Sequence, residues 1–167
     1  MIGNFMTKYI YQKIKYMSLI ITNENNDLFV SQRSNNSKPM NGYFQPIGGK
    51  IEDNETIIEA VKREADEEAG IEVNGLKPQL QFIFHYTVKG FNYFPKRPFK
   101  LVKRTVYVYE LKSSTQKIIE NGITQNMEPE NFTEWTWKPI NELQQLQCIT
   151  TLEKYIEQKN GLLNKNL

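Results

Sequence analysis

The chain has 167 residues, of which 24% are charged and 12% are aromatic, and its formal net charge is +2. This length suits one domain with a substantial core, so we expect residues 1–167 to form a single domain with its core at about 9–158. So small a net charge does not by itself indicate a protein that binds polyanions. The only cysteine, Cys148, excludes a disulfide within the chain and favours a reducing, cytoplasmic compartment.

No apolar run approaches the length of a membrane span. Residues 1–17 lack the continuous apolar stretch of a signal peptide, so we expect no membrane partner. His85 is the only histidine, which excludes a zinc site built from several histidines. We expect His85 on a strand, beside a pocket or in the core, and Cys148 on a C-terminal helix as a small, partly buried residue without a catalytic role.

Alternating apolar residues, rich in β-branched and aromatic side chains, predict strands at 9–22, 28–32, 43–47, 79–88, 101–111 and 132–138. Helical spacing predicts helices at 57–69, 141–147 and 151–158. Polar or glycine-rich segments predict turns and loops at 23–27, 34–41, 48–49 and 89–100. Strands on both sides of one central helix, with a terminal helix, favour an α/β sandwich.

The helix at 57–69 has clear end signals. Thr56 followed by Glu59 forms a capping-box pattern, and Gly70 stands where a left-handed residue commonly ends a helix. An apolar stripe along this helix is expected to pack inward, and its members are Ile57, Ile58, Val61 and Ala65.

The same helix carries acidic side chains at positions i, i+3 and i+4. Glu64, Glu67 and Glu68 therefore project from one side, where their like charges weaken the helix. A hard divalent cation with oxygen ligands would offset that repulsion. The alternative interpretation is a solvated acidic face. Arg63 is placed to pair with Glu67 or with Glu55.

The spacing of these residues resembles the signature of the Nudix hydrolases, G-x5-E-x7-R-E-U-x-E-E-x-G-U with U aliphatic. Residues 49–71 read GKIEDNETIIEAVKREADEEAGI and match every fixed position, with Ala65 smaller than the usual aliphatic residue. The resemblance implies the αβα Nudix sandwich with a mixed β-sheet. It also implies Mg²⁺-dependent cleavage, with Mn²⁺ as a substitute cation, of nucleoside diphosphates linked to another group.

Functional residues follow from the resemblance position by position. The metal ligands would be the Gly48 carbonyl, Glu64, Glu67, Glu68 and a loop acid, for which we choose Glu130 over Glu128 and Glu134. Glu64, Glu67 and Arg63 would be the catalytic residues, and Glu64 or Glu130 the general base. The substrate would contact Arg33, Lys50 and Glu130.

The leading function is therefore a nucleoside triphosphate pyrophosphohydrolase that converts an oxidised, non-standard or surplus nucleotide to its monophosphate and pyrophosphate. A second reading is a Nudix hydrolase of capped RNA, dinucleoside polyphosphates or nucleotide sugars. Its support is the basic and aromatic segment 89–104, which suits stacked bases and phosphates and contains Lys96, Arg97, Lys100, Lys103 and Arg104 among Phe91, Tyr93, Phe94 and Phe99. RNA is not the favoured partner, because such a loop is as readily a solvated hairpin. A third reading is a non-catalytic nucleotide-binding module. Base specificity and oligomeric state do not follow from the sequence.

Overall fold

A computed structural model describes residues 10–35, 39–73, 75–90, 100–114, 117–118 and 126–161. In these residues seven strands form one mixed sheet with the order β3-β2-β1-β6-β5, in which β4 pairs with β1 and β7 with β2. The strands are β1 (Ile10–Thr22), β2 (Leu28–Gln32), β3 (Phe44–Gln45), β4 (Ile47–Lys50), β5 (Gln79–Gly90), β6 (Lys100–Lys112) and β7 (Thr136–Lys138). The helices are α1 (Ile57–Ala69), α3 (Ile140–Leu143) and α4 (Thr150–Lys159).

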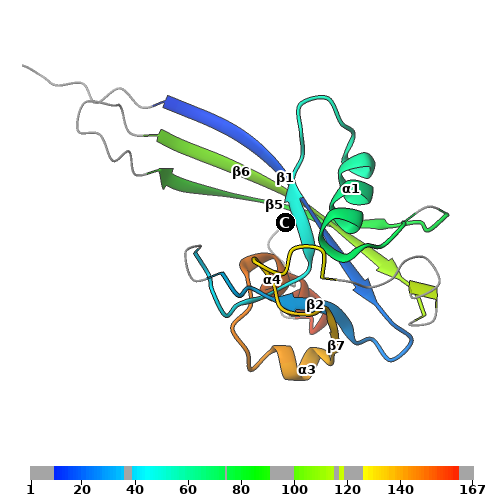
Figure 1. The fold of residues 1–167 in the computed structure, drawn as a ribbon. Coiled ribbons are helices and arrows are strands. Elements are labelled where there is room, and N and C mark those ends of the chain that lie inside the picture. The colour runs from blue at the N-terminus through cyan, green and yellow to red at the C-terminus, as the bar shows by residue number, and fades with distance from the viewer. Residues whose placement is uncertain are drawn as a thin grey trace, which may run out of the picture.

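The central strand β1 contributes apolar side chains to both faces of the sheet. Its neighbour β6 runs parallel to it from the pair Ile10↔Lys100 to the pair Thr22↔Lys112. Met17, Leu19 and Ile21 join the core that contains the buried side of α1. Ile20 joins a second core with Leu152 and Tyr155 of α4. The strands thus pass between α1 and α4 (Figure 1), which confirms the predicted αβα sandwich with a mixed sheet.

Helix α1 has the predicted bounds and end signals. The Thr56 side chain accepts from the Glu59 N–H while the Glu59 carboxylate accepts from the Thr56 N–H. Gly70 ends the helix in the left-handed region, at φ 62°. One detail is wrong: Ile58 is 40% exposed, and Ala60 is buried beside Val61 and Ala65 instead. The buried apolar stripe of α1 is therefore rotated by part of a helical turn from the predicted one.

The predicted turn at Gly48 and Gly49 is also wrong, because both residues lie inside β4. Gly48 pairs with Ser18 and Gly49 with Met17 of β1. A Cβ on Gly48 would lie 2.7 Å from the Met17 carbonyl oxygen. The absence of a side chain, rather than a turn conformation, is what this position requires.

The remaining differences are at the ends of elements and at two single residues. Strand β7 and helix α3 are shorter than the predicted elements at 132–138 and 141–147. Cys148 is buried, but it lies before α4 and not within it, and its backbone forms an isolated β-bridge with Phe44. His85 lies on β5 as predicted, yet it is exposed, with Nδ1 3.0 Å from the Thr105 hydroxyl.

The outer parts of β1, β5 and β6 extend together away from the helices (Figure 1). Of the basic loop, residues 91–99, including Lys96 and Arg97, lie outside the described part of the chain. Within the described residues, no helix is long and apolar enough to cross a membrane.

Candidate active site

The acidic face of α1 packs against the edge strand β4. The Gly48 N–H donates a 3.0 Å hydrogen bond to Glu68 Oε2. A Cβ built on Gly49 would lie 2.0 Å from Glu64 Oε1, so the Glu64 carboxylate occupies the space that a side chain would take. Gly49 therefore allows Glu64 to approach the backbone of β4 closely, while the Gly48 N–H binds Glu68 beside it.

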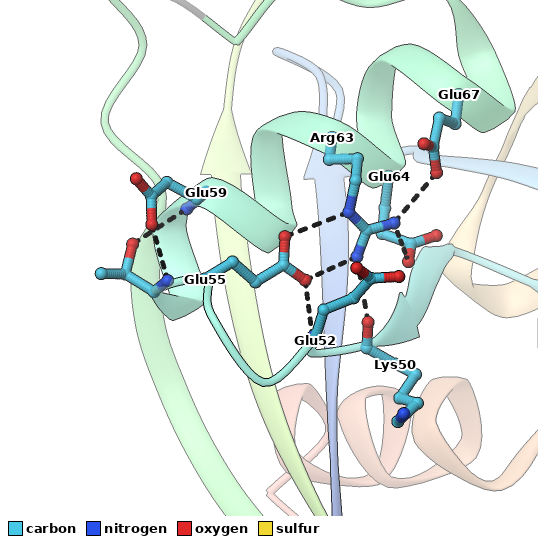
Figure 2. Close-up of polar contacts among 8 residues, drawn as sticks. Lys50, Glu52, Glu55, Glu59, Arg63, Glu64 and Glu67 are labelled. Carbon is cyan, nitrogen blue, oxygen red and sulfur yellow. Dashed lines mark hydrogen bonds and ion pairs between the residues drawn. The ribbon is translucent and has the colours of Figure 1, made fainter.

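Arg63 joins three carboxylates beside this contact (Figure 2). Its guanidinium lies 2.6 Å from Glu55, 2.7 Å from Glu64 and 2.9 Å from Glu67, and it also donates to the Lys50 carbonyl. The sequence offered Glu67 or Glu55 as its partner, and the structure contains both pairs. The hydrogen bond from Arg63 lowers the pKa of Glu55, so this carboxylate stays ionised. Arg63 thus orients the acids that surround it.

Glu68 is the buried acid of the group, with 6% of its surface exposed. Burial raises the pKa of its carboxyl well above the usual range, although the Gly48 N–H and the charge of Arg33 oppose this. The charges of Glu64 and Glu128 raise the Glu68 pKa further. Burial likewise raises the pKa of Glu64, against the effect of Arg63. The site thus concentrates more negative charge than its protein cations balance.

The segment 126–135 closes one side of the acidic group. The Trp135 indole N–H and the Met127 backbone N–H both donate to the Glu68 carbonyl, at 2.9 and 3.3 Å. The adjacent Glu128 backbone is held by a hydrogen bond from its N–H to Asn126 Oδ1, and Asn131 donates to the Glu128 carboxylate at 2.7 Å. Glu130 is exposed and receives a longer bond from Asn131. The loop acid whose charge acts on Glu68 is Glu128.

Among the described residues, no three acidic, histidine or cysteine side chains converge tightly enough to hold a metal ion. Glu64 and Glu67 are instead turned toward Arg63. The donor chemistry nevertheless fits a hard cation, because Glu68 is a buried carboxylate whose pKa is raised by neighbouring carboxylates. A divalent cation would remove that electrostatic cost.

A cleft of about 220 Å³ begins at Gly48 and Gly49 and continues over the sheet face that carries α4. Arg33 lies at this cleft, and its Nη1 donates to Gln45 Oε1 at 3.0 Å. Lys50 is exposed at the end of β4 and is not part of the cleft lining.

Three further residues line the cleft, namely Tyr16, Tyr86 and Arg104. The sequence indicated Arg104 only as part of the basic segment 89–104 and did not single out Tyr16 or Tyr86. They come from three different strands, and only the register Tyr16↔Val106 and Tyr86↔Arg104 brings them to one face. The sequence holds one signal for this grouping: alternate residues of a strand share a face, so Tyr16 belongs to the even-numbered face of β1 and Arg104 to that of β6. That signal needs the pairing of β1 with β6, which the sequence does not specify.

Comparisons with known proteins identify the family and the fold of the chain. The family model "NUDIX domain" matches residues 14–158, which confirms the resemblance found at 49–71. The chain is 40% identical over 62 residues to an 8-oxo-dGTP diphosphatase of Proteus vulgaris, covering 37% of this chain and 54% of that protein. The chain thus spans about half the length of the curated relatives it matches.

Solved structures share the fold at low sequence identity. A MutT protein of Bacillus halodurans superposes with a TM-score of 0.61 at 22% identity, covering 92% of this chain and 85% of that one. The Escherichia coli dihydroneopterin triphosphate pyrophosphohydrolase superposes with a TM-score of 0.60 at 18% identity, covering 86% of this chain and 92% of that one.

Proposed function

We propose that this protein hydrolyses nucleotides, and the premise is that the chain belongs to the NUDIX domain family, whose model matches residues 14–158. The enzyme cleaves a phosphoric anhydride bond in a nucleoside triphosphate, oxidised or otherwise non-standard, and releases the monophosphate and pyrophosphate. The curated relative of Proteus vulgaris is named an 8-oxo-dGTP diphosphatase, which supports this substrate class. The single cysteine supports a cytoplasmic location.

The observation that carries the proposal is the acidic group packed on Gly48 and Gly49, two residues that also line the cleft. Glu68 is buried, hydrogen-bonded to Gly48 and electrostatically coupled to Glu64 and Glu128. Mg²⁺ would be held there by Glu64, Glu67, Glu68, the Gly48 carbonyl and a loop acid, with Mn²⁺ as a substitute. When bound, the cation neutralises phosphate charge and polarises a phosphoryl oxygen. A non-catalytic module would not need so many acids at one place.

The residues of the chain have distinct tasks in this reaction. Glu64, packed on Gly49 and held by Arg63, is the proposed base that takes the proton from the attacking water. Arg63 fixes the carboxylate of Glu64 and keeps Glu67 on the same side of α1. Arg33 and Lys50 are proposed to contact the phosphates, where positive charge stabilises the charge that develops in the transition state.

The loop acid is better assigned to Glu128 than to Glu130. The hydrogen bonds from Asn131 and to Asn126 hold Glu128 beside Glu68, whereas Glu130 is exposed. Glu128 is therefore our proposed ligand and the rival of Glu64 as general base. Separation of the two roles requires pH–rate profiles of Glu64→Gln and Glu128→Gln together with their Mg²⁺ affinities.

The test of the function is a screen for pyrophosphate and phosphate release over nucleoside triphosphates, 8-oxo-dGTP, capped RNA, dinucleoside polyphosphates and nucleotide sugars. We expect Mg²⁺-dependent turnover that is highest on triphosphates and is lost in Glu68→Gln. Strong preference for long capped RNA would favour the second reading, in which the basic residues around Lys103 bind RNA. Nucleotide binding without any turnover would favour the non-catalytic module.

A further inference from the structure

Arg104 of β6 contacts two tyrosine rings at the wall of the cleft. Its guanidinium carbon lies 5.3 Å from the ring centre of Tyr16 and 5.7 Å from that of Tyr86. Its Nη1 also donates to the Tyr86 hydroxyl at 3.2 Å. Two cation–π contacts and one hydrogen bond therefore restrict the position of the guanidinium.

Most of the hydrogen-bonding capacity of Arg104 remains unused within the described residues. A guanidinium has five N–H donors, and the bond to Tyr86 uses one of them. Nε is buried with no partner, and no carboxylate of the described residues lies within ion-pair distance of Arg104. Structural arginines are normally paired with an acid, so a held guanidinium at a cleft, with no carboxylate partner in the described part of the chain, indicates recognition of a ligand.

The position of Arg104 suits the far end of a nucleotide. Gly48 pairs with Ser18, which lies level with Val108, and Arg104 is four residues before Val108 on β6. Four strand residues span roughly 13 Å along β6, and Gly48 and Val108 lie two strand spacings apart, about 10 Å across the sheet, so Gly48 and Arg104 are about 16 Å apart. This separation is on the scale of the distance between the terminal phosphates and the base of an extended nucleoside triphosphate. The cleft between these two points is lined by apolar side chains, which include Met40, Val106 and Ile149.

We propose that Arg104 selects the base of the substrate and favours guanine over adenine. This inference rests on the proposed function, because it takes the phosphates to lie at the acidic group. Arginine donates to the adjacent acceptors O6 and N7 of guanine, whereas adenine presents an amino donor beside N7. The rings of Tyr16 and Tyr86 hold the guanidinium and offer aromatic surface on which a base can stack.

A phosphate is the other ligand that arginine recognises well. It fits this place less well, because two tyrosine rings lie against the Arg104 guanidinium, and the acids that would hold a phosphate-bound cation pack on Gly48 and Gly49 at the other end of the cleft lining. A phosphate contact would weaken binding of every nucleotide equally when Arg104 is removed. A base contact would weaken guanine nucleotides selectively.

The test measures binding without turnover, by calorimetry of the full chain in EDTA with GMP, AMP and 7-deaza-GMP. The variants are Arg104→Gln and Arg104→Lys, the second of which keeps the charge but loses the planar fork. The matched control is Lys103→Gln, which removes the same charge from the next residue on β6, outside the cleft lining. Thermal melts of all variants establish that each is folded.

We expect the wild type to bind GMP roughly 10-fold or more tightly than AMP, and 7-deaza-GMP less tightly than GMP. Both Arg104 variants should reduce this preference to about 2-fold or less, with little change for AMP, while Lys103→Gln retains it. An absence of preference for GMP in the wild type would contradict the inference. An unchanged preference in folded Arg104 variants, or an equal loss for GMP and AMP, would contradict it as well.

The result is separable from the proposed function because no metal and no turnover are involved. Selective GMP binding that depends on Arg104, in a protein that hydrolyses no nucleotide, would refute the hydrolase and leave the base assignment in place. Hydrolysis of triphosphates by a protein whose base preference ignores Arg104 would refute only the inference about Arg104.

Discussion

The indole N–H of Trp135 donates a 2.9 Å hydrogen bond to the backbone carbonyl of Glu68. Glu68 lies in the last turn of α1, where carbonyl groups have no partner within the helix. The same bond ties the segment that carries Glu128 to the residue that carries the buried carboxylate. One contact therefore completes the helix end and positions the loop acid at the site.

Trp135→Phe should weaken this attachment while keeping the stacking of ring 135 on Phe29, whose ring centre lies 5.4 Å away. We expect the free energy of unfolding in urea to fall by about 1–3 kcal/mol, because a buried carbonyl loses its better donor. Trp137→Phe is the matched control: its ring also contacts Phe29, but no hydrogen bond of its indole is found among the described residues. Equal losses in the two variants would show that the Trp135 hydrogen bond contributes nothing.

The two loop acids should differ sharply in activity. Glu128→Gln should lower kcat by roughly 100-fold or more, since the side chain is held beside Glu68 and would act on the reacting water or its cation. Glu130→Gln should change kcat by less than about 3-fold, because Glu130 is exposed. Steady-state kinetics at saturating Mg²⁺ compares them, and a larger effect at Glu130 would restore the assignment made from the sequence.

Glu68→Gln should have opposite effects on activity and on the stability of the metal-free protein. Burial and neighbouring charges raise the pKa of Glu68 in the folded state, so folding disfavours its ionised form. The stability that this group contributes is present at low pH and is lost as pH rises through the raised pKa. In EDTA at pH 7 we therefore expect a higher Tm for Glu68→Gln than for the wild type.

Added Mg²⁺ should reverse that order, because a cation that binds only the folded wild type raises its Tm. Asp66→Asn removes a charge from the exposed side of the same helix and is the control. A lower Tm of Glu68→Gln than of the wild type in EDTA would contradict an electrostatic cost at Glu68. A Mg²⁺-induced rise in Tm that remains in Glu68→Gln would contradict a cation site at this acid.

The two glycines of β4 should respond differently to alanine. In Gly49→Ala the new Cβ meets the end of a flexible side chain, so Glu64 moves aside, with little loss of stability and a large loss of activity. In Gly48→Ala the Cβ meets the Met17 carbonyl of β1, so the strand pairing is strained and Tm falls. Thermal melts and kcat measured on both variants check this, and an active Gly49→Ala enzyme would remove Glu64 from its proposed role.

The sequence predicted those parts of the fold that depend on local patterns. The bounds of α1 follow from Thr56, Glu59 and Gly70, and the bounds of β2 from its apolar run and the polar segments on both sides. It did not predict that Gly48 and Gly49 continue a strand, because that depends on pairing with β1 across the sheet. The grouping of Arg104 with Tyr16 and Tyr86 at the cleft was missed for the same reason, since strand register brings these three residues together.

The acidic group was predictable because helix periodicity places Glu64, Glu67 and Glu68 on one side of α1. The choice between Glu128 and Glu130 was not, because both lie in one irregular segment. Only the hydrogen bonds of Asn126, Asn131 and Trp135 determine which of them lies beside Glu68.

The most direct test of the central claim is product analysis of a nucleoside triphosphate hydrolysed in ¹⁸O-labelled water with Mg²⁺. We predict equal amounts of nucleoside monophosphate and pyrophosphate, with one labelled oxygen in only one of the two products, and no turnover by Glu68→Gln. Release of nucleoside diphosphate and single phosphate, or the same products at an unchanged rate from Glu68→Gln, would contradict the account.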